Sequence, residues 1–192
     1  MSQERESAAA RLAVGTTGMW WLLASLSMIF AASVVGLFWV RAAAEVWPPV
    51  GAPRLPSRLW PSTIIIVLST VPMEWARRLW RRPGRPGLGA ALLLTLVLGV
   101  AFLLAQTRGW FLLAAAQFTA TANLYAFTFY WLTVLHALHV LGGVGPLAVV
   151  TWRAWRRDPG WPAHGVRYAA MYWHFLTVVW LVLFAVFRIT AA

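Results

Sequence analysis

Cysteine is absent from the 192 residues of this chain, which excludes disulfides, thiolate zinc sites and iron–sulfur clusters held by cysteine. Lysine is absent as well, so every basic side chain is an arginine. Only five residues are acidic, and there is no phosphate-binding loop, no pair of carboxylates and no Ser–His–Asp set. These absences argue against acid–base catalysis by carboxylates as the central activity.

Long uncharged apolar stretches, in contrast, are abundant. Hydrophobic residues make up 61% of the chain and charged residues only 11%, and the charges gather between the apolar stretches. Such stretches are typical of membrane spans, and spans must be helical because lipid offers no partners to an unpaired backbone. The sequence therefore predicts an all-α fold, a polytopic membrane helix bundle of five transmembrane helices. The predicted spans are residues 18–40, 60–80, 87–106, 123–152 and 168–187.

Two boundaries need a further argument. The uncharged stretch between Arg108 and Arg153 is too long for one helix perpendicular to the membrane. We divide it at residues 117–123, where Gln117, Thr119, Thr121 and Asn123 offer capping groups. Residues 110–118 are expected at the membrane interface. The apolar run of the first span is too long for the core of a signal peptide.

The arginines predict the orientation of the chain. The net charge of +11 does not indicate nucleic-acid binding, because the arginines flank apolar spans, where they meet lipid headgroups. Eleven arginines fall in the N-terminal tail and the second and fourth connectors, and five fall on the other side. The positive-inside rule then places residues 1–17 in the cytoplasm as a tail, followed by the membrane domain 18–190 with its C-terminus outside.

Aromatic, small and hydroxyl residues give expectations about packing. The 14 tryptophans lie mostly near span ends, as an aromatic belt does. Serines and threonines inside the spans are expected to join helices by hydrogen bonds. These are Ser25, Ser27, Ser33, Thr128 and Thr133. The small residues expected at close helix–helix approaches are Ala31, Ala32, Gly36, Ala137, Gly142 and Gly143.

Ionisable residues within spans are costly and mark candidate sites. His136 and His139 share a helix face, and His139 and His174 are expected at similar depth on different helices. Two such histidines could ligate a b-type haem, although the simpler interpretation is hydrogen bonding to neighbouring helices. Glu74 is expected to pair with Arg77 or Arg78 and is a candidate for a proton-related role.

Two segments carry a family resemblance. Residues 129–143 read FYWLTVLHALHVLGG, and residues 172–181 read YWHFLTVVWL. The first is similar to the FY-x-LTG-x-HG-x-HV-x-x-G segment of cytochrome c oxidase subunit III, and the second to the YWHFVDVVWL segment of that family. Weaker matches follow in the same order from residue 18 to 188. The chain thus resembles the short, five-helix bacterial form of this haem–copper oxidase subunit.

The resemblance implies a non-catalytic membrane subunit in aerobic respiratory electron transport. It implies packing against oxidase subunit I, with subunit II in the same complex, in the bacterial inner membrane. Haem and copper are expected in those partners and no cofactor in this chain, while phospholipid is expected to bind between helices and to support stability and proton uptake. The positions carried over as lipid or structural contacts are His136, His139, Tyr172, Trp173, His174 and Trp180.

The chain departs from the family pattern at membrane carboxylates. Leu26 stands where the family usually has Glu, and Thr177 stands where it usually has Asp. Arg167 and Gly109 occupy positions that are often acidic. This leaves room for a divergent branch, such as the accessory subunit of nitric oxide reductases. A free-standing b-type cytochrome using His139 and His174 is a further alternative, and a small transporter is disfavoured because no internal repeat is present.

Overall fold

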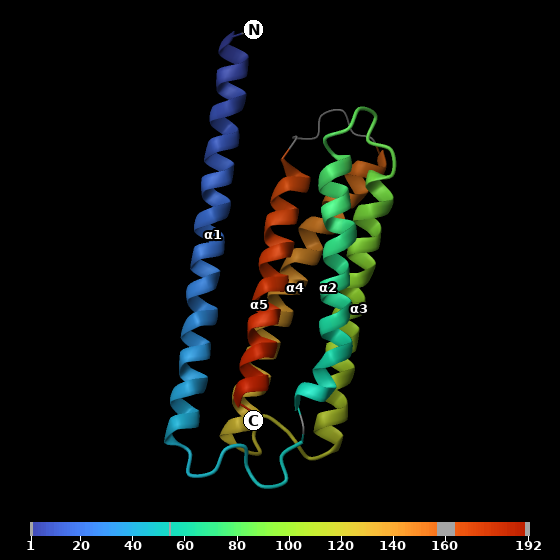
Figure 1. Ribbon diagram of the computed structural model, residues 1–192. Coiled ribbons are helices and arrows are strands. Elements are labelled where there is room, and N and C mark those ends of the chain that lie inside the picture. Colours follow the sequence, from blue (N-terminus) through green and yellow to red (C-terminus); the bar gives the residue numbers. More distant parts are fainter. Residues whose placement is uncertain (1, 54, 157–163, 191–192) are drawn as a thin grey trace.

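The computed structural model describes residues 2–53, 55–156 and 164–190, with side chains described for 13–53, 59–156 and 164–190. Five helices run over these residues (Figure 1): α1 Ser2–Ala43, α2 Leu55–Leu79, α3 Leu88–Ala115, α4 Leu124–Arg156 and α5 Gly165–Thr190. Each contains a segment long and apolar enough to cross a membrane. The all-α prediction with five spans is therefore confirmed.

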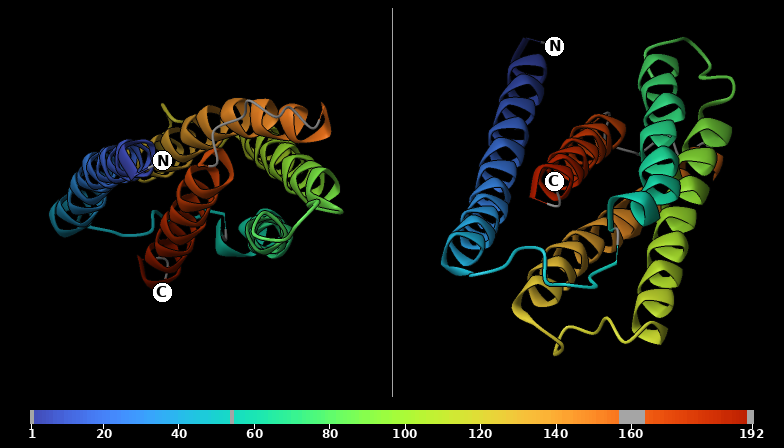
Figure 2. Two further views of the ribbon diagram at one scale, coloured as in Figure 1. Left: turned by 90° about the horizontal axis from the view of Figure 1, so that it is seen from above. Right: turned by 60° about the horizontal axis from the view of Figure 1, so that its bottom comes forward.

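Helices α2 to α5 form a closed ring in which sequential neighbours run in opposite directions (Figures 1 and 2). Helix α2 contacts α3 and α5, and α4 completes the ring between them. In the part of the chain that is described, α1 contacts only α4 and α5, and just 17% of its most apolar window is buried, against 33–44% in the other spans. Helix α1 is therefore an outer helix leaning on a four-helix bundle.

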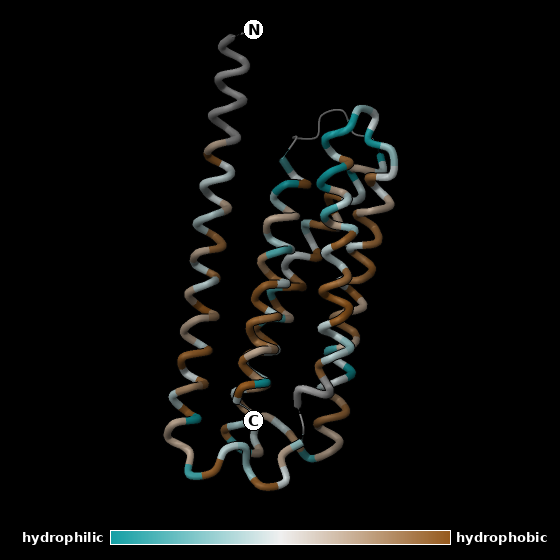
Figure 3. The backbone as a smooth tube through the Cα atoms, in the orientation of Figure 1, coloured by the Kyte–Doolittle hydropathy of each residue, from teal (hydrophilic) through white to brown (hydrophobic). Residues whose placement is uncertain are grey.

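Large apolar side chains fill the centre of the ring. Trp180, Phe102, Phe129, Met73 and Leu132 are all nearly inaccessible to solvent. Hydropathy follows the same division, because apolar residues occupy the lengths of the helices and polar residues gather at the turn between α2 and α3 (Figure 3). The turn contains Arg81, Arg82 and Arg85, of which the Arg85 guanidinium lies over the Trp80 ring at 3.5 Å from its centroid.

The third span differs from the sequence prediction. Helix α3 does not end at Gln106 but continues without a break to Ala115, so residues 110–115 belong to the helix. The charge that suggested the boundary, Arg108, lies on an exposed face, where a long side chain can extend toward water. The helix ends where Gln117 adopts a left-handed conformation, with φ of 59°.

The division before α4 is confirmed at its predicted cap. The Asn123 side-chain oxygen accepts a hydrogen bond from the backbone N–H of Ala126 at 2.8 Å, which satisfies one of the free donors of the first turn. The connector between α1 and α2 is also held in place, because the Trp47 indole donates to the Thr190 carbonyl at 2.9 Å. Three residues of the orientation and belt arguments, Arg54, Arg157 and Trp161, lie outside the described residues.

Candidate functional site

His136 is enclosed by aromatic rings at the centre of the molecule. Its side chain is completely buried, and its ring centroid lies 5.0 Å from that of Trp180, 5.7 Å from that of Phe102 and 6.1 Å from that of Phe30. Neither ring nitrogen has a hydrogen-bond partner among the described residues. The imidazole thus joins α1, α3 and α5 around α4 by ring packing.

His139 lies one turn further along the same face of α4. Its Nδ1 donates to the Leu135 carbonyl at 2.7 Å, since a carbonyl oxygen can only accept. Its ring packs against Phe30 of α1 at 5.2 Å between centroids. Its own carbonyl accepts a hydrogen bond from the Tyr172 hydroxyl of α5 at 3.1 Å. His139 therefore connects α4 to both α1 and α5.

The two buried tryptophans of α5 are hydrogen-bonded to hydroxyls of α2. The Trp173 indole donates to Ser69 Oγ and the Trp180 indole to Thr63 Oγ1, each at 2.9 Å. The Trp173 ring also lies directly on the backbone of α3, where a Cβ atom placed on Gly99 would fall 2.5 Å from it. These contacts fix α5 against α2 and α3.

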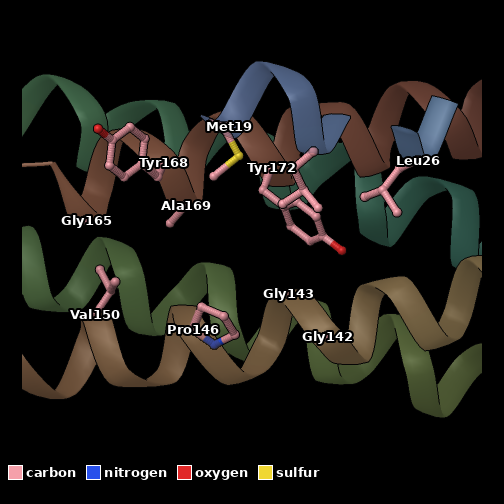
Figure 4. Close-up of a pocket in the computed structure, with 11 residues that line it drawn as sticks. Met19, Leu26, Gly142, Gly143, Pro146, Val150, Gly165, Tyr168, Ala169 and Tyr172 are labelled. Atoms are coloured by element: carbon pink, nitrogen blue, oxygen red, sulfur yellow. The ribbon is translucent and has the colours of Figure 1, made fainter. Parts of the chain in front are cut away.

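A cavity of about 400 Å³ lies between α1, α4 and α5 (Figure 4). Its lining is almost wholly apolar, and Tyr172 extends from α5 toward the adjacent glycines Gly142 and Gly143 of α4. Leu26 lines this cavity from α1, at the position where the family pattern usually has Glu. The remaining lining residues are Met19, Leu22, Pro146, Val150, Gly165, Tyr168 and Ala169. A space of this size and character suits an aliphatic chain.

The two glycines differ in what surrounds them. A Cβ atom on Gly143 would fall 2.8 Å from a ring carbon of Tyr172, so this glycine is required for close approach of α4 and α5, as the sequence predicted. A Cβ atom on Gly142 would meet nothing nearer than 3.9 Å, and one on Gly36 nothing within 4 Å. Predicting close approaches at Gly142 and Gly36 was therefore wrong.

A second hollow of about 500 Å³ lies between α2 and α5, at the end of the bundle where α2 ends. Arg77 Nε and Nη2 each donate to a Glu74 carboxylate oxygen at 2.7 Å, and Arg78 Nε donates at 3.1 Å. These bonds confirm the predicted pairing of Glu74. His174 Nε2 of α5 lies 3.8 Å from Glu74 Oε2.

The histidines proposed as haem ligands have separate surroundings. His139 contacts Phe30 of α1, whereas His174 lies beside Glu74 of α2. Within residues 13–53, 59–156 and 164–190, no three His, Asp or Glu side chains converge in a way that could hold a metal ion.

His136, His139, Trp173 and Trp180 lie within a segment, covering most of the chain, that a protein-family model matches. The family model described as cytochrome c oxidase subunit III matches residues 12–191. The chain belongs to the cytochrome c oxidase subunit III family. With its five apolar helices, it is a multi-pass membrane protein.

Curated relatives agree with this family. "Cytochrome c oxidase subunit 3" of the cyanobacterium Synechocystis sp. is 35% identical over 168 residues, which cover 84% of this chain and 70% of the relative. The protein of the same name from Pelomedusa subrufa is 34% identical over 73% of this chain and 54% of its own length. "Probable cytochrome c oxidase subunit 3" of Rickettsia felis is 35% identical over 72% and 51%. The chain thus spans about half the length of the last two.

Within the subunit III family segment, sequence reasoning identified the histidines and tryptophans but missed their partners. Ser69 and Thr63 lie 104 and 117 residues before the indoles that they bind, and no local pattern announces such pairs. Gly99 was likewise missed as a contact of Trp173. The feature of the sequence that points to the cavity is the adjacent pair Gly142 and Gly143 of α4.

Proposed function

We propose that this chain is the non-catalytic subunit III of a haem–copper terminal oxidase in aerobic respiratory electron transport. The observation that carries the proposal is the family match over residues 12–191, together with the names of the relatives. The oxidase subunit I, with subunit II in the same complex, is the proposed partner, and it supplies the haem and copper. The described part of this chain contributes shape, apolar surface and a few polar contacts to that partner.

Phospholipid binding is the second part of the proposal. The cavity between α1, α4 and α5 is apolar along its walls, and arginines gather at the end of the bundle that α4 reaches at Arg156. An acyl chain fits the former and a headgroup phosphate the latter. Tyr172 is the proposed lipid contact among the residues carried over from the family. His136, His139, Trp173 and Trp180 are proposed as structural contacts.

The proposed location is the bacterial inner membrane, with the N-terminus in the cytoplasm and the C-terminus outside. Arginine asymmetry supports this orientation, since positive residues are retained on the cytoplasmic side. In that orientation Glu74 lies near the inner surface. A supporting role in proton uptake by subunit I belongs to the proposal, with Glu74 as its candidate residue, because Glu74 is the one acidic residue inside the spans that the described residues form.

Affinity purification from membranes tests the proposal. The chain should bring down a haem-bearing subunit, and the chain purified alone should show no Soret absorbance. A Soret band in the isolated chain that disappears in His174→Ala would instead establish the free-standing b-type cytochrome. Assaying the purified complex with oxygen and with nitric oxide separates the oxidase from the nitric oxide reductase alternative. In an oxidase, Glu74→Gln should slow turnover if Glu74 serves proton uptake, and unchanged turnover would remove that role.

A further inference from the structure

The cluster formed by Glu74, Arg77, Arg78 and His174 contains two arginines but only one carboxylate, so it has an excess of positive charge. Both Glu74 oxygens already accept hydrogen bonds from Arg77, and Arg78 reaches the carboxylate through Nε alone. The side chain of Arg78 is 73% exposed, and that of His174 is 39% exposed. One carboxylate thus faces two guanidinium groups and an imidazole, and because Glu74 already pairs with Arg77 through both oxygens, it does not balance the charge of the exposed Arg78 as well.

This cluster lies in the last turns of its span, close to the end that the proposed orientation places at the inner surface. Glu74 is five residues before the end of α2, or about 7.5 Å along the helix axis, and His174 is nine residues inside α5, or about 13.5 Å. Ionisable groups at such depth are expensive against lipid and almost always face protein or water. A protein surface that carries an acceptor for Arg78 would cover the cluster at lower cost than lipid chains.

An apolar seam continues from the cluster down both helices. On α2 the exposed side chains Ile64, Leu68, Val71 and Trp75 follow at alternating intervals of four and three residues and lead to Arg78. On α5, Val178, Leu181 and Val182 are exposed beyond His174. The two helices lie side by side on one side of the bundle, while α4 lies on the other (Figures 1 and 2). A third helix could pack along this seam by the same spacing.

We propose that the α2–α5 seam ending at Glu74, Arg78 and His174 is the docking face for a transmembrane helix of the haem-bearing partner, and that this helix presents a carboxylate to Arg78. The inference rests on the proposed function, because the partner is the catalytic subunit of that complex. The excess positive charge of the cluster, on the exposed Arg78, favours a partner helix with an acidic side chain at this position. The apolar seam supplies the remaining contact area.

Photo-cross-linking in the assembled complex tests the face directly. Trp75 and Trp152 are each 55% exposed, and each lies four residues before the end of its helix, α2 or α4. Replacing either with p-benzoylphenylalanine gives two probes matched in exposure and depth on opposite sides of the bundle. The probe at Trp75 should cross-link to the haem-bearing subunit, and the probe at Trp152 should do so far less. A cross-link at Trp152 alone, at neither position, or to phospholipid only at Trp75 overturns the proposal.

Charge substitution provides the second measurement. Arg78→Gln should lower recovery of the haem-bearing subunit about tenfold, since truncating one member of a buried charge pair leaves the other unpaired. Arg81→Gln, an exposed arginine just beyond α2, should leave recovery unchanged. Equal recovery with both variants contradicts the charge pairing. If the unaltered chain brings down no haem-bearing subunit at all, the proposed function fails as well, whereas an intact complex with unaffected variants overturns only the docking face.

Discussion

At the scale of single residues, indole-to-hydroxyl hydrogen bonds connect the helices. Among the described residues, four tryptophans donate to a hydroxyl on another helix, and each of those hydroxyls donates in turn to a carbonyl of its own helix. The pairs are Trp110 with Thr133, Trp131 with Ser33, Trp173 with Ser69 and Trp180 with Thr63. In lipid, where burial alone does not draw helices together, such bonds supply specificity. Their positions in the sequence suggested an aromatic belt at the membrane interface, but these four tryptophans also connect helices to one another by hydrogen bonds.

The Trp180–Thr63 bond gives a measurable coupling. We expect Trp180→Phe and Thr63→Val each to lower the unfolding free energy, and the double variant to lower it by less than the sum, with a coupling of about 1 kcal/mol. Denaturation in detergent micelles followed by circular dichroism measures this cycle. Trp39→Phe, at a tryptophan that is 74% exposed, is the control and should change little. Full additivity of the two variants would show that the bond contributes nothing.

The adjacent glycines of α4 provide a second matched pair. Gly143→Ala should lower the unfolding free energy by about 1–3 kcal/mol, because the new methyl group meets the Tyr172 ring in a packed contact. Gly142→Leu should leave stability nearly unchanged and lower the phospholipid retained per chain, because its side chain enters the apolar cavity. Thermal unfolding and lipid phosphorus analysis distinguish the two. Loss of stability at Gly142 with none at Gly143 would contradict this assignment of space.

At the scale of the helices, the sequence was informative wherever composition alone decides. Apolar length predicted the five spans, and Asn123 predicted the start of α4, because caps and spans are local features. The end of α3 could not be predicted in the same way. A charged residue such as Arg108 suggested the end of a span, but the helix continues past it because Arg108 lies on the exposed face of α3. The hydrogen-bond partners of Trp173 and Trp180 depend on which helices are neighbours in the bundle, and a single sequence does not reveal which helices are neighbours.

The outer position of α1 makes its attachment sensitive to one ring. Phe30 is 5% exposed and packs against both His136 and His139 of α4. Phe30→Ala should remove this contact and loosen α1. The free energy of unfolding should fall by about 3–5 kcal/mol if the neighbouring side chains do not fill the cavity that is left. Phe38→Ala, at a ring that is 41% exposed on the same helix, should cost much less.

Spin labels can report the loosening itself. Because the chain has no cysteine, Val14→Cys and Arg167→Cys introduce two labels without background, both at exposed positions on α1 and α5. The distance distribution between them should broaden in the Phe30→Ala background and stay narrow in the Phe38→Ala background. Identical distributions in the two backgrounds would mean that α1 is held by other contacts.

At the scale of the whole molecule, polar features are concentrated at one end. The turn between α2 and α3 carries Arg81, Arg82 and Arg85, and α4 ends beside it with Arg153 and Arg156. The Glu74 cluster lies near this end, and the cavity between α1, α4 and α5 extends toward it, since Gly165 at the start of α5 lines its wall. The two hollows lie on different sides of α5, so lipid and a partner helix can be accommodated together.

Cysteine labelling decides which end of the bundle faces the cytoplasm. Glu45 lies in the connector after α1 and Arg82 in the turn after α2, and both side chains are exposed. With the arginine-rich end inside, Glu45→Cys should react with a membrane-impermeant maleimide in intact spheroplasts, while Arg82→Cys should react only after permeabilisation. Both variants should label fully once the membrane is opened, which controls for accessibility, and the native chain contributes no background because it has no cysteine. The reverse pattern would place the N-terminus outside and move the Glu74 cluster to the outer surface, where it could not serve proton uptake from the cytoplasm.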